Sequence, residues 1–99
     1  MDKRAGKAHF VALREAVSQA LRDADPIRLI QRGAPPDEYE PEVGTVLPRL
    51  RGATSSGDVR TILHEEFVHW FGDEVAGRIE HYDQATESIW AILRINKDV

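Results

Sequence analysis

The chain has 99 residues, 41% hydrophobic and 30% charged, and its 13 basic and 17 acidic residues give a net charge of −4. This length and composition are typical of one soluble globular domain with a single core. The negative charge disfavours nucleic acid as a partner, and the lack of cysteine excludes disulfides, thiol catalysis and thiolate metal sites. No apolar run could cross a bilayer and no signal-peptide pattern is present, so we expect a cytoplasmic protein without membrane contacts.

The first predicted element is an amphipathic helix from about Arg4 to Ala24, with residues 1–6 expected to fray. Its apolar residues recur at helical steps of three and four: Phe10, Leu13, Val17, Ala20, Leu21 and Ala24. The helix should end before Pro26, because proline disfavours helical geometry at the residue that precedes it. Asp25 then suits the N-cap of a short second helix, which Gly33 closes in a left-handed conformation.

Proline and glycine also divide the middle of the chain. A main helix is predicted from about Pro41 to Arg51, with a kink or a broken last turn at Pro48, whose ring meets the carbonyl four residues back. Residues 53–57 form a loop, in which Ser55 or Ser56 can cap the helix that follows.

The next helix carries the strongest periodic signal in the chain and should end at Gly72. Its apolar residues are Val59, Ile62, Leu63, Phe67, Trp70 and Phe71. Residues 73–77 are ambiguous, and a last helix is predicted from about Ile79 to Asn96. No run of alternating polarity indicates a strand. The sequence therefore predicts an all-α single domain, residues 1–99, built as a compact bundle of four main helices plus one short helix.

Two histidines near two acids, in His64-Glu65-Glu66-Phe67-Val68-His69, invite comparison with a zinc site. The helical zinc motif requires histidines four positions apart, whereas these are five apart. At about 100° per residue, five steps separate two side chains by roughly 140° around a helix. We therefore interpret both histidines as solvated or partly packed, and we predict no metal and no cofactor.

The densest acidic cluster consists of Asp37, Glu38, Glu40 and Glu42. Calcium or magnesium is conceivable there because hard cations prefer oxygen ligands, although the spacing does not match the calcium loop. Acids near a helix start also stabilise it electrostatically, which is the interpretation we favour; cation binding stays open. Asp25 could be a general base only in a pocket that raises its pKa, and its place before a proline favours capping.

Two aromatic residues are candidates for contact with a partner. For Tyr39 we favour a ring packed on the core with its hydroxyl bonded to the backbone, over a surface contact. Trp70, like Phe71 and Trp90, lies on a periodic face, so core packing is the first expectation. A tryptophan at an exposed rim would instead indicate a partner surface. The candidate partner contacts are Asp37, Glu38, Tyr39, Glu40 and Trp70.

The corner of the chain also carries a family resemblance. Asp25-Pro26-Ile27, then Gly33-Ala34-Pro35 and Asp37-Glu38-Tyr39-Glu40, resembles a family of small uncharacterised bacterial helical proteins with a D-P-I and a G-x-P-x-D-E-Y motif. The likeness covers residues 25–51. Arg28 departs from the pattern, in which a small residue, often glycine, stands. The resemblance implies a helical fold and little about activity, because the family is a domain of unknown function; similar D-P-I stretches occur in proteins thought to neutralise bacterial toxins.

No phosphate-binding loop, dinucleotide fingerprint or nucleophile elbow is present. We therefore expect no enzyme but a protein–protein interaction module or homodimer, with a toxin-neutralising protein as one variant. It should expose a contiguous apolar or acidic patch. The alternative is a metal-dependent or hydrolytic enzyme, in which folding would bring Asp37, Glu38 and Glu40 together with His64 or His81.

Overall fold

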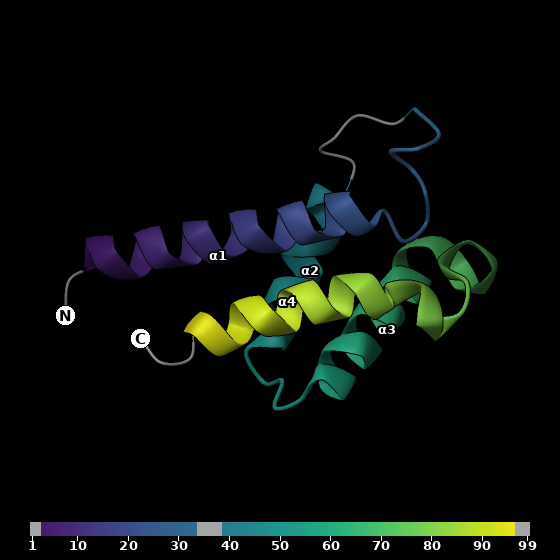
Figure 1. The fold of residues 1–99 in the computed structure, drawn as a ribbon. Coiled ribbons are helices and arrows are strands. Elements are labelled where there is room, and N and C mark those ends of the chain that lie inside the picture. The colour runs from purple at the N-terminus through teal and green to yellow at the C-terminus, as the bar shows by residue number, and fades with distance from the viewer. Residues whose placement is uncertain (1–2, 34–38, 97–99) are drawn as a thin grey trace.

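Helices make up most of the chain in the computed structural model, which describes residues 3–33 and 39–96 (Figure 1). They are α1 (Lys3–Ala24), α2 (Glu40–Leu50), α3 (Ser56–Ala76) and α4 (Asp83–Asn96), with a short 3-10 helix, η1 (Ile79–Tyr82), before α4. No strand occurs within these described ranges. The predicted all-α bundle with four main helices is confirmed. Fraying of residues 1–6 stays a prediction, although the backbone is helical from Lys3.

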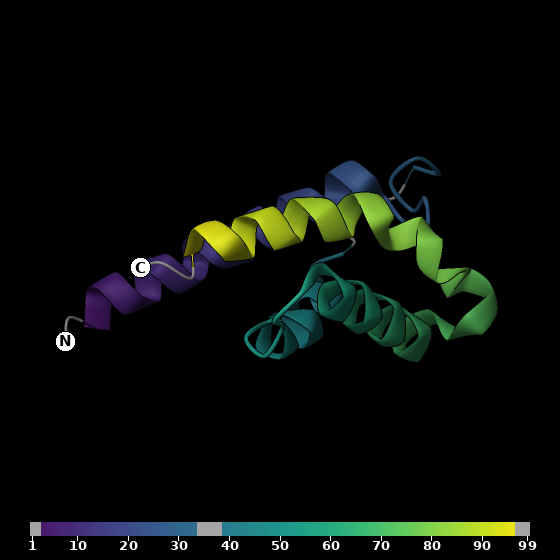
Figure 2. The ribbon, with the colours of Figure 1, turned by 60° about the horizontal axis from the view of Figure 1, so that its bottom comes forward.

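The helices form two layers (Figures 1 and 2). In one layer, α1 and α4 lie side by side and antiparallel, so that the start of α1 and the end of α4 point to the same end of the molecule. In the other, α2 and α3 form an antiparallel hairpin that packs against one side of this pair. The link at 51–55 is short, and short links join antiparallel neighbours.

The core lies between the layers and is built from the predicted apolar faces. Its buried members include Val17, Leu21, Val43, Val46, Leu47, Val59, Leu63, Phe67, Ala85 and Ile89. Phe67 is fully buried, and its ring centroid lies 5.9 Å from that of Tyr39 and 5.1 Å from that of Tyr82. The ring of Phe71 packs on it from the same helix at 5.7 Å. Phe67 thus joins α3 to the start of α2 and to η1.

The corner between α1 and α2, residues 25–33, is a run of turns. The short helix predicted there is wrong. The φ angles are 44° at Asp25, 60° at Arg28 and 101° at Gly33, and a residue with positive φ cannot continue a right-handed helix. Gly33 does have the positive φ predicted for it, but it closes a turn, in which its N–H donates to the carbonyl of Ile30 at 3.0 Å.

Tyr39 and Asp25 together hold this corner against the core. The Tyr39 ring is buried, and its hydroxyl donates to the Asp25 carboxylate and accepts the N–H of Leu29 at 3.4 Å. The same carboxylate accepts the N–H of Ile30 at 3.1 Å and of Gln31 at 2.9 Å. An N-cap would instead accept from donors two or three residues on. Asp25 is therefore not the N-cap of a helix that was predicted; its carboxylate instead accepts backbone N–H groups of a turn that folds back onto it.

These contacts set the proton affinities of both side chains. Burial raises the pKa of Asp25, but the hydrogen bonds from Tyr39 and from the backbone N–H groups outweigh burial, so its pKa lies below the usual range. Burial, together with the Asp25 carboxylate, raises the pKa of Tyr39 well above its usual range. At neutral pH the pair is therefore one carboxylate and one neutral phenol.

Replacing Arg28 with glycine is expected to raise the free energy of unfolding by about 0.5 kcal/mol. A left-handed conformation costs a non-glycine residue about 1–2 kcal/mol, and the freer unfolded chain of glycine offsets about 0.4–1 kcal/mol of that relief. The exposed Arg28 side chain makes no hydrogen bond or ion pair with any residue that the structure describes, so little is lost with it. Urea denaturation measures the change. Arg28→Ala keeps the strained backbone and should give no gain; an equal gain in both variants would show that φ is not the cause.

The ends of α2 and α3 follow from their proline, serine and glycine residues. α2 continues past Pro48 to Leu50, and its end tightens through a bond from the N–H of Gly52 to the carbonyl of Arg49 at 3.1 Å. Ser55 is confirmed as the N-cap of α3, because its Oγ accepts the N–H of Asp58 at 3.1 Å.

α3 changes direction at Gly72, where the sequence predicted its end. Gly72 has φ 83° and ψ 167°, outside the helical region, and one further helical turn follows to Ala76. The last predicted helix begins three residues later, with η1 as its first turn and α4 as the remainder.

Candidate functional site

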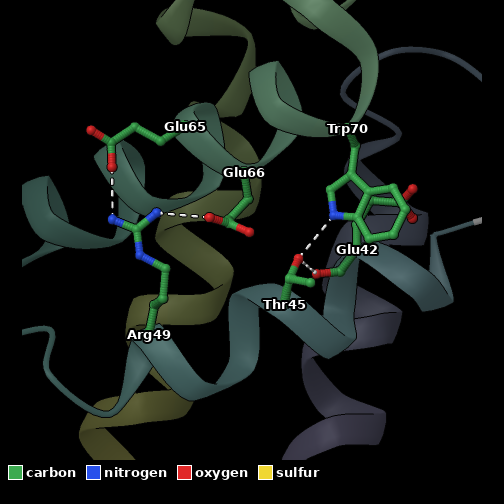
Figure 3. A network of polar contacts seen from close by, with 6 residues as sticks. All are labelled: Glu42, Thr45, Arg49, Glu65, Glu66 and Trp70. Atoms are coloured by element: carbon green, nitrogen blue, oxygen red, sulfur yellow. Dashed lines mark hydrogen bonds and ion pairs between the residues drawn. The ribbon is translucent and has the colours of Figure 1, made fainter.

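The most distinctive exposed feature lies where α2 and α3 run side by side. We call it the Trp70 surface and define it by Thr45 and Arg49 of α2 and Glu65, Glu66 and Trp70 of α3 (Figure 3). Buried Leu63 and Phe67 anchor α3 to the core, so the side chains at its edge are held in place by a packed helix.

Trp70 is 43% exposed although its ring is held in one orientation. Its Nε1–H donates to the Thr45 hydroxyl at 2.9 Å, and that hydroxyl donates to the backbone carbonyl of Glu42 at 3.1 Å (Figure 3). The indole N–H is the only hydrogen-bond donor of a tryptophan side chain, and it is already used here. What Trp70 presents to solvent is therefore apolar and aromatic surface.

Arg49 is held equally firmly beside it. Its guanidinium lies 2.7 Å from a carboxylate oxygen of Glu65 and 3.0 Å from one of Glu66, so that it bridges two successive acids of α3 (Figure 3). The hydrogen bond that Arg49 donates to Glu65 raises the pKa of Arg49; desolvation opposes this rise, and the hydrogen bond to Glu66 adds to it. The bridge couples α2 to α3 across the surface.

The other candidate partner contacts are placed differently. Asp37 and Glu38 lie outside the described residues. Tyr39 is 1% exposed, so it is not a partner contact, and the packed interpretation that we favoured is correct. Glu40 pairs with Arg14 at 3.3 Å and with Arg22 at 3.6 Å, which ties the start of α2 to α1. Trp70 is the candidate that reaches the surface without an ion-pair role inside the fold.

The histidines have separate environments. His64 is partly buried, with Nε2 3.0 Å from the carbonyl oxygen of Gly77 and its ring edge-on to Tyr82 at 5.7 Å. His69 is exposed on α3, and His81 is exposed on η1. In the part of the chain that the structure describes, no three histidines or acids lie close enough to hold a metal ion.

A pocket of about 390 Å³ lies between the α1–α2 corner and the end of α3, lined by residues that include Asp25, Arg28, Arg32, Glu74 and His81. Two carboxylates balance two guanidinium groups there. The Asp25 carboxylate is already bonded to Tyr39 and to backbone N–H groups, and its lowered pKa makes it a poor base near neutral pH. Asp25 is therefore not a prepared general base of this pocket.

Sequence reasoning singled out Trp70 but missed Thr45, Arg49, Glu65 and Glu66. The signal was the short loop before α3, which predicts that α2 and α3 are antiparallel neighbours. The register between the two helices decides that Arg49 meets Glu65 and Glu66. It cannot be predicted from the sequence of either helix alone.

Within the described residues, no helix has both the length and the apolar character needed to span a bilayer. Comparisons with models of protein families, with curated proteins and with solved structures found no match. The resemblance around D-P-I and D-E-Y therefore stays a prediction.

Proposed function

We propose that this protein is a non-catalytic interaction module that binds another protein through the Trp70 surface. The supporting observation is an aromatic ring that is 43% exposed yet fixed by a hydrogen bond to Thr45. A side chain that is ordered before binding loses little conformational entropy on binding. Tryptophan and arginine are the residue types most enriched at binding hot spots, and Trp70 and Arg49 are both held in place here.

The enzymatic alternative has less support. Glu40 is paired with two arginines of α1, and His64 is bonded to the backbone of Gly77. Both side chains are engaged in contacts within the fold, so neither is positioned as a general acid or base. A toxin-neutralising role is one specific form of the interaction proposal, in which the partner would be a toxin.

Photo-crosslinking in the native host tests the proposal. A benzoylphenylalanine placed at exposed His69, next to Trp70, should give a covalent product with a partner protein, and the same group at exposed Ser88 of α4 should not. Adding Trp70→Ala should reduce the yield about tenfold or more, because a hot-spot tryptophan contributes about 2 kcal/mol or more. A product with the mass of two copies of this chain would identify the homodimer version.

Circular dichroism must first show that the Trp70→Ala variant keeps the helical content of the wild type. Given a folded variant, equal products from positions 69 and 88, or none from position 69, would count against the Trp70 surface as a binding site.

A further inference from the structure

We infer that the partner of the Trp70 surface is a cationic protein surface, in which an arginine stacks on the Trp70 ring while further basic side chains meet the acids of α3. This inference rests on the proposed function and adds the chemistry of the partner.

The first observation is where the negative charge of the molecule is concentrated. α3 contains five carboxylates and one arginine, Arg60, and so carries a net charge of −4. The whole chain also has a net charge of −4, so the remaining residues balance to zero. A potential concentrated on one helix favours encounter with a partner of opposite charge.

The second observation is that the bases near α3 do not cancel this charge at the Trp70 surface. Arg60 is directed away to α4 and η1, with Nε 2.8 Å from Asp83 and a terminal nitrogen 3.9 Å from Glu80. Arg49 supplies one positive charge to two carboxylates, Glu65 and Glu66. The surface therefore keeps an excess negative charge beside the tryptophan.

Two more acids follow immediately on the same helix. Asp73 and Glu74 are exposed just past the bend at Gly72, and neither side chain makes an ion pair with any residue in the described ranges. Asp73 is therefore available to basic groups from outside, whereas Glu74 lines the pocket in which Arg28 and Arg32 supply two positive charges.

The third observation concerns what Trp70 itself can bind. Because its N–H is used by Thr45, its exposed area offers the negative face of an aromatic ring. A guanidinium group stacks on such a face and can at the same time bind a carboxylate, which a lysine ammonium does less well. An aromatic ring flanked by carboxylates therefore favours arginine in the partner.

The test uses defined peptide probes. A short alanine-based helical peptide with arginines along one face is titrated into the ¹⁵N-labelled full chain, and matched peptides carry lysine or glutamate at the same positions. We expect the arginine peptide to shift the indole N–H signal of Trp70 and the amides of residues 65–74. The lysine peptide should bind more weakly and the glutamate peptide not at all. Raising the salt concentration should weaken binding, because exposed charges are screened.

Charge-matched variants separate this surface from general attraction to an acidic protein. Glu65→Gln with Glu66→Gln should weaken binding of the arginine peptide about three- to tenfold, as expected for exposed charge pairs. Asp73→Asn should weaken it about twofold and disrupts no ion pair within the described residues. Glu15→Gln with Glu87→Gln removes two exposed charges on α1 and α4. It should weaken binding of the arginine peptide less than about half as much as Glu65→Gln with Glu66→Gln does.

Three results would overturn the inference: an equal loss of binding in the Glu15/Glu87 control, shifts centred away from Trp70, or equal binding of the glutamate peptide. The crosslinking result is separate. Suppose that a partner is captured at position 69 but the chain binds the arginine peptide no better than the glutamate peptide. This result would reject the cationic partner and would still support the Trp70 surface as a binding site. Absence of any product at position 69 would reject the proposed function itself.

Discussion

Replacing Phe67 with alanine is expected to lower the free energy of unfolding by about 3–5 kcal/mol, the range for large aromatic residues removed from a packed core. Phe67 is fully buried and touches three aromatic rings: Tyr39 before α2, Tyr82 in η1, and Phe71 four residues along its own helix. The two tyrosines cannot move inward to fill the space, because the Tyr39 hydroxyl is bonded to Asp25 and the Tyr82 hydroxyl donates to the carbonyl of Ala76 at 2.7 Å. A small domain has a total stability of about 5–15 kcal/mol, so this loss approaches the limit of folding.

Urea denaturation followed by circular dichroism measures the effect, and Phe67→Leu, which leaves a smaller void, should cost less and keep the variant folded. The matched control is Trp70→Ala, three residues along the same helix. Trp70 is 43% exposed, so its removal should cost less than about 1 kcal/mol, the usual range for surface substitutions with one hydrogen bond lost. Equal losses at positions 67 and 70 would contradict the assignment of Phe67 as the centre of the core.

Replacing Asp25 with alanine is expected to lower the free energy of unfolding by about 2–3 kcal/mol at neutral pH. The change leaves the part-buried N–H of Ile30 and the hydroxyl of buried Tyr39 without their acceptor, and an unsatisfied buried group costs about 1–3 kcal/mol. The N–H of Gln31 is exposed and can bind water instead. It also places alanine at φ 44°, where aspartate and asparagine are better tolerated. Asp25→Asn keeps an acceptor and the backbone tolerance, so it should cost less than Asp25→Ala.

The contribution of Asp25 should depend on pH in a defined direction. Its pKa in the folded chain lies below the ordinary value of 3.8, so the folded state favours the carboxylate. The stability it adds is therefore present above pH 3.8 and is lost as the pH falls through the lowered pKa. The difference in free energy of unfolding between the wild type and Asp25→Ala should shrink across that window, while all other carboxylates are common to both proteins.

Tyr39→Phe offers a second measurement on the same pair. It keeps the buried ring against Phe67 and removes only the hydroxyl. This hydroxyl donates the hydrogen bond that contributes most to lowering the pKa of Asp25. In this variant the pKa of Asp25 should rise, so that the loss of stability in acid begins at a higher pH than in the wild type. If the difference in free energy of unfolding between the wild type and Asp25→Ala stays constant from neutral pH to acid, the carboxylate does not stabilise the corner.

The interaction proposal and these stability predictions concern neighbouring residues with separate roles. Phe67 points into the core and Trp70 lies at its edge, although both belong to the apolar stripe that the sequence shows on α3. A variant of Trp70 that loses partner binding and keeps its stability, beside a variant of Phe67 that loses stability, would separate a contact residue from a core residue on one helix.

The sequence by itself determined the helices and most of their buried faces. Apolar residues at steps of three and four form the face that each helix buries in the core of the domain. Ser55 caps α3 with its own hydroxyl, and Gly72 ends the straight part of α3. These features depend on interactions between residues a few positions apart, which a helix brings together wherever it lies.

Only the tertiary structure decided the corner, the buried state of Tyr39 and the exposed state of Trp70. Asp25 could cap a local helix or bind donors five, six and fourteen residues away, and the second arrangement prevails because Tyr39 is buried against Phe67. Trp70 lies at the edge because the register of α2 places Thr45 under its N–H, and the same register sets Arg49 between Glu65 and Glu66. Such contacts join residues distant in the chain, and periodicity carries no information about which distant residues will meet.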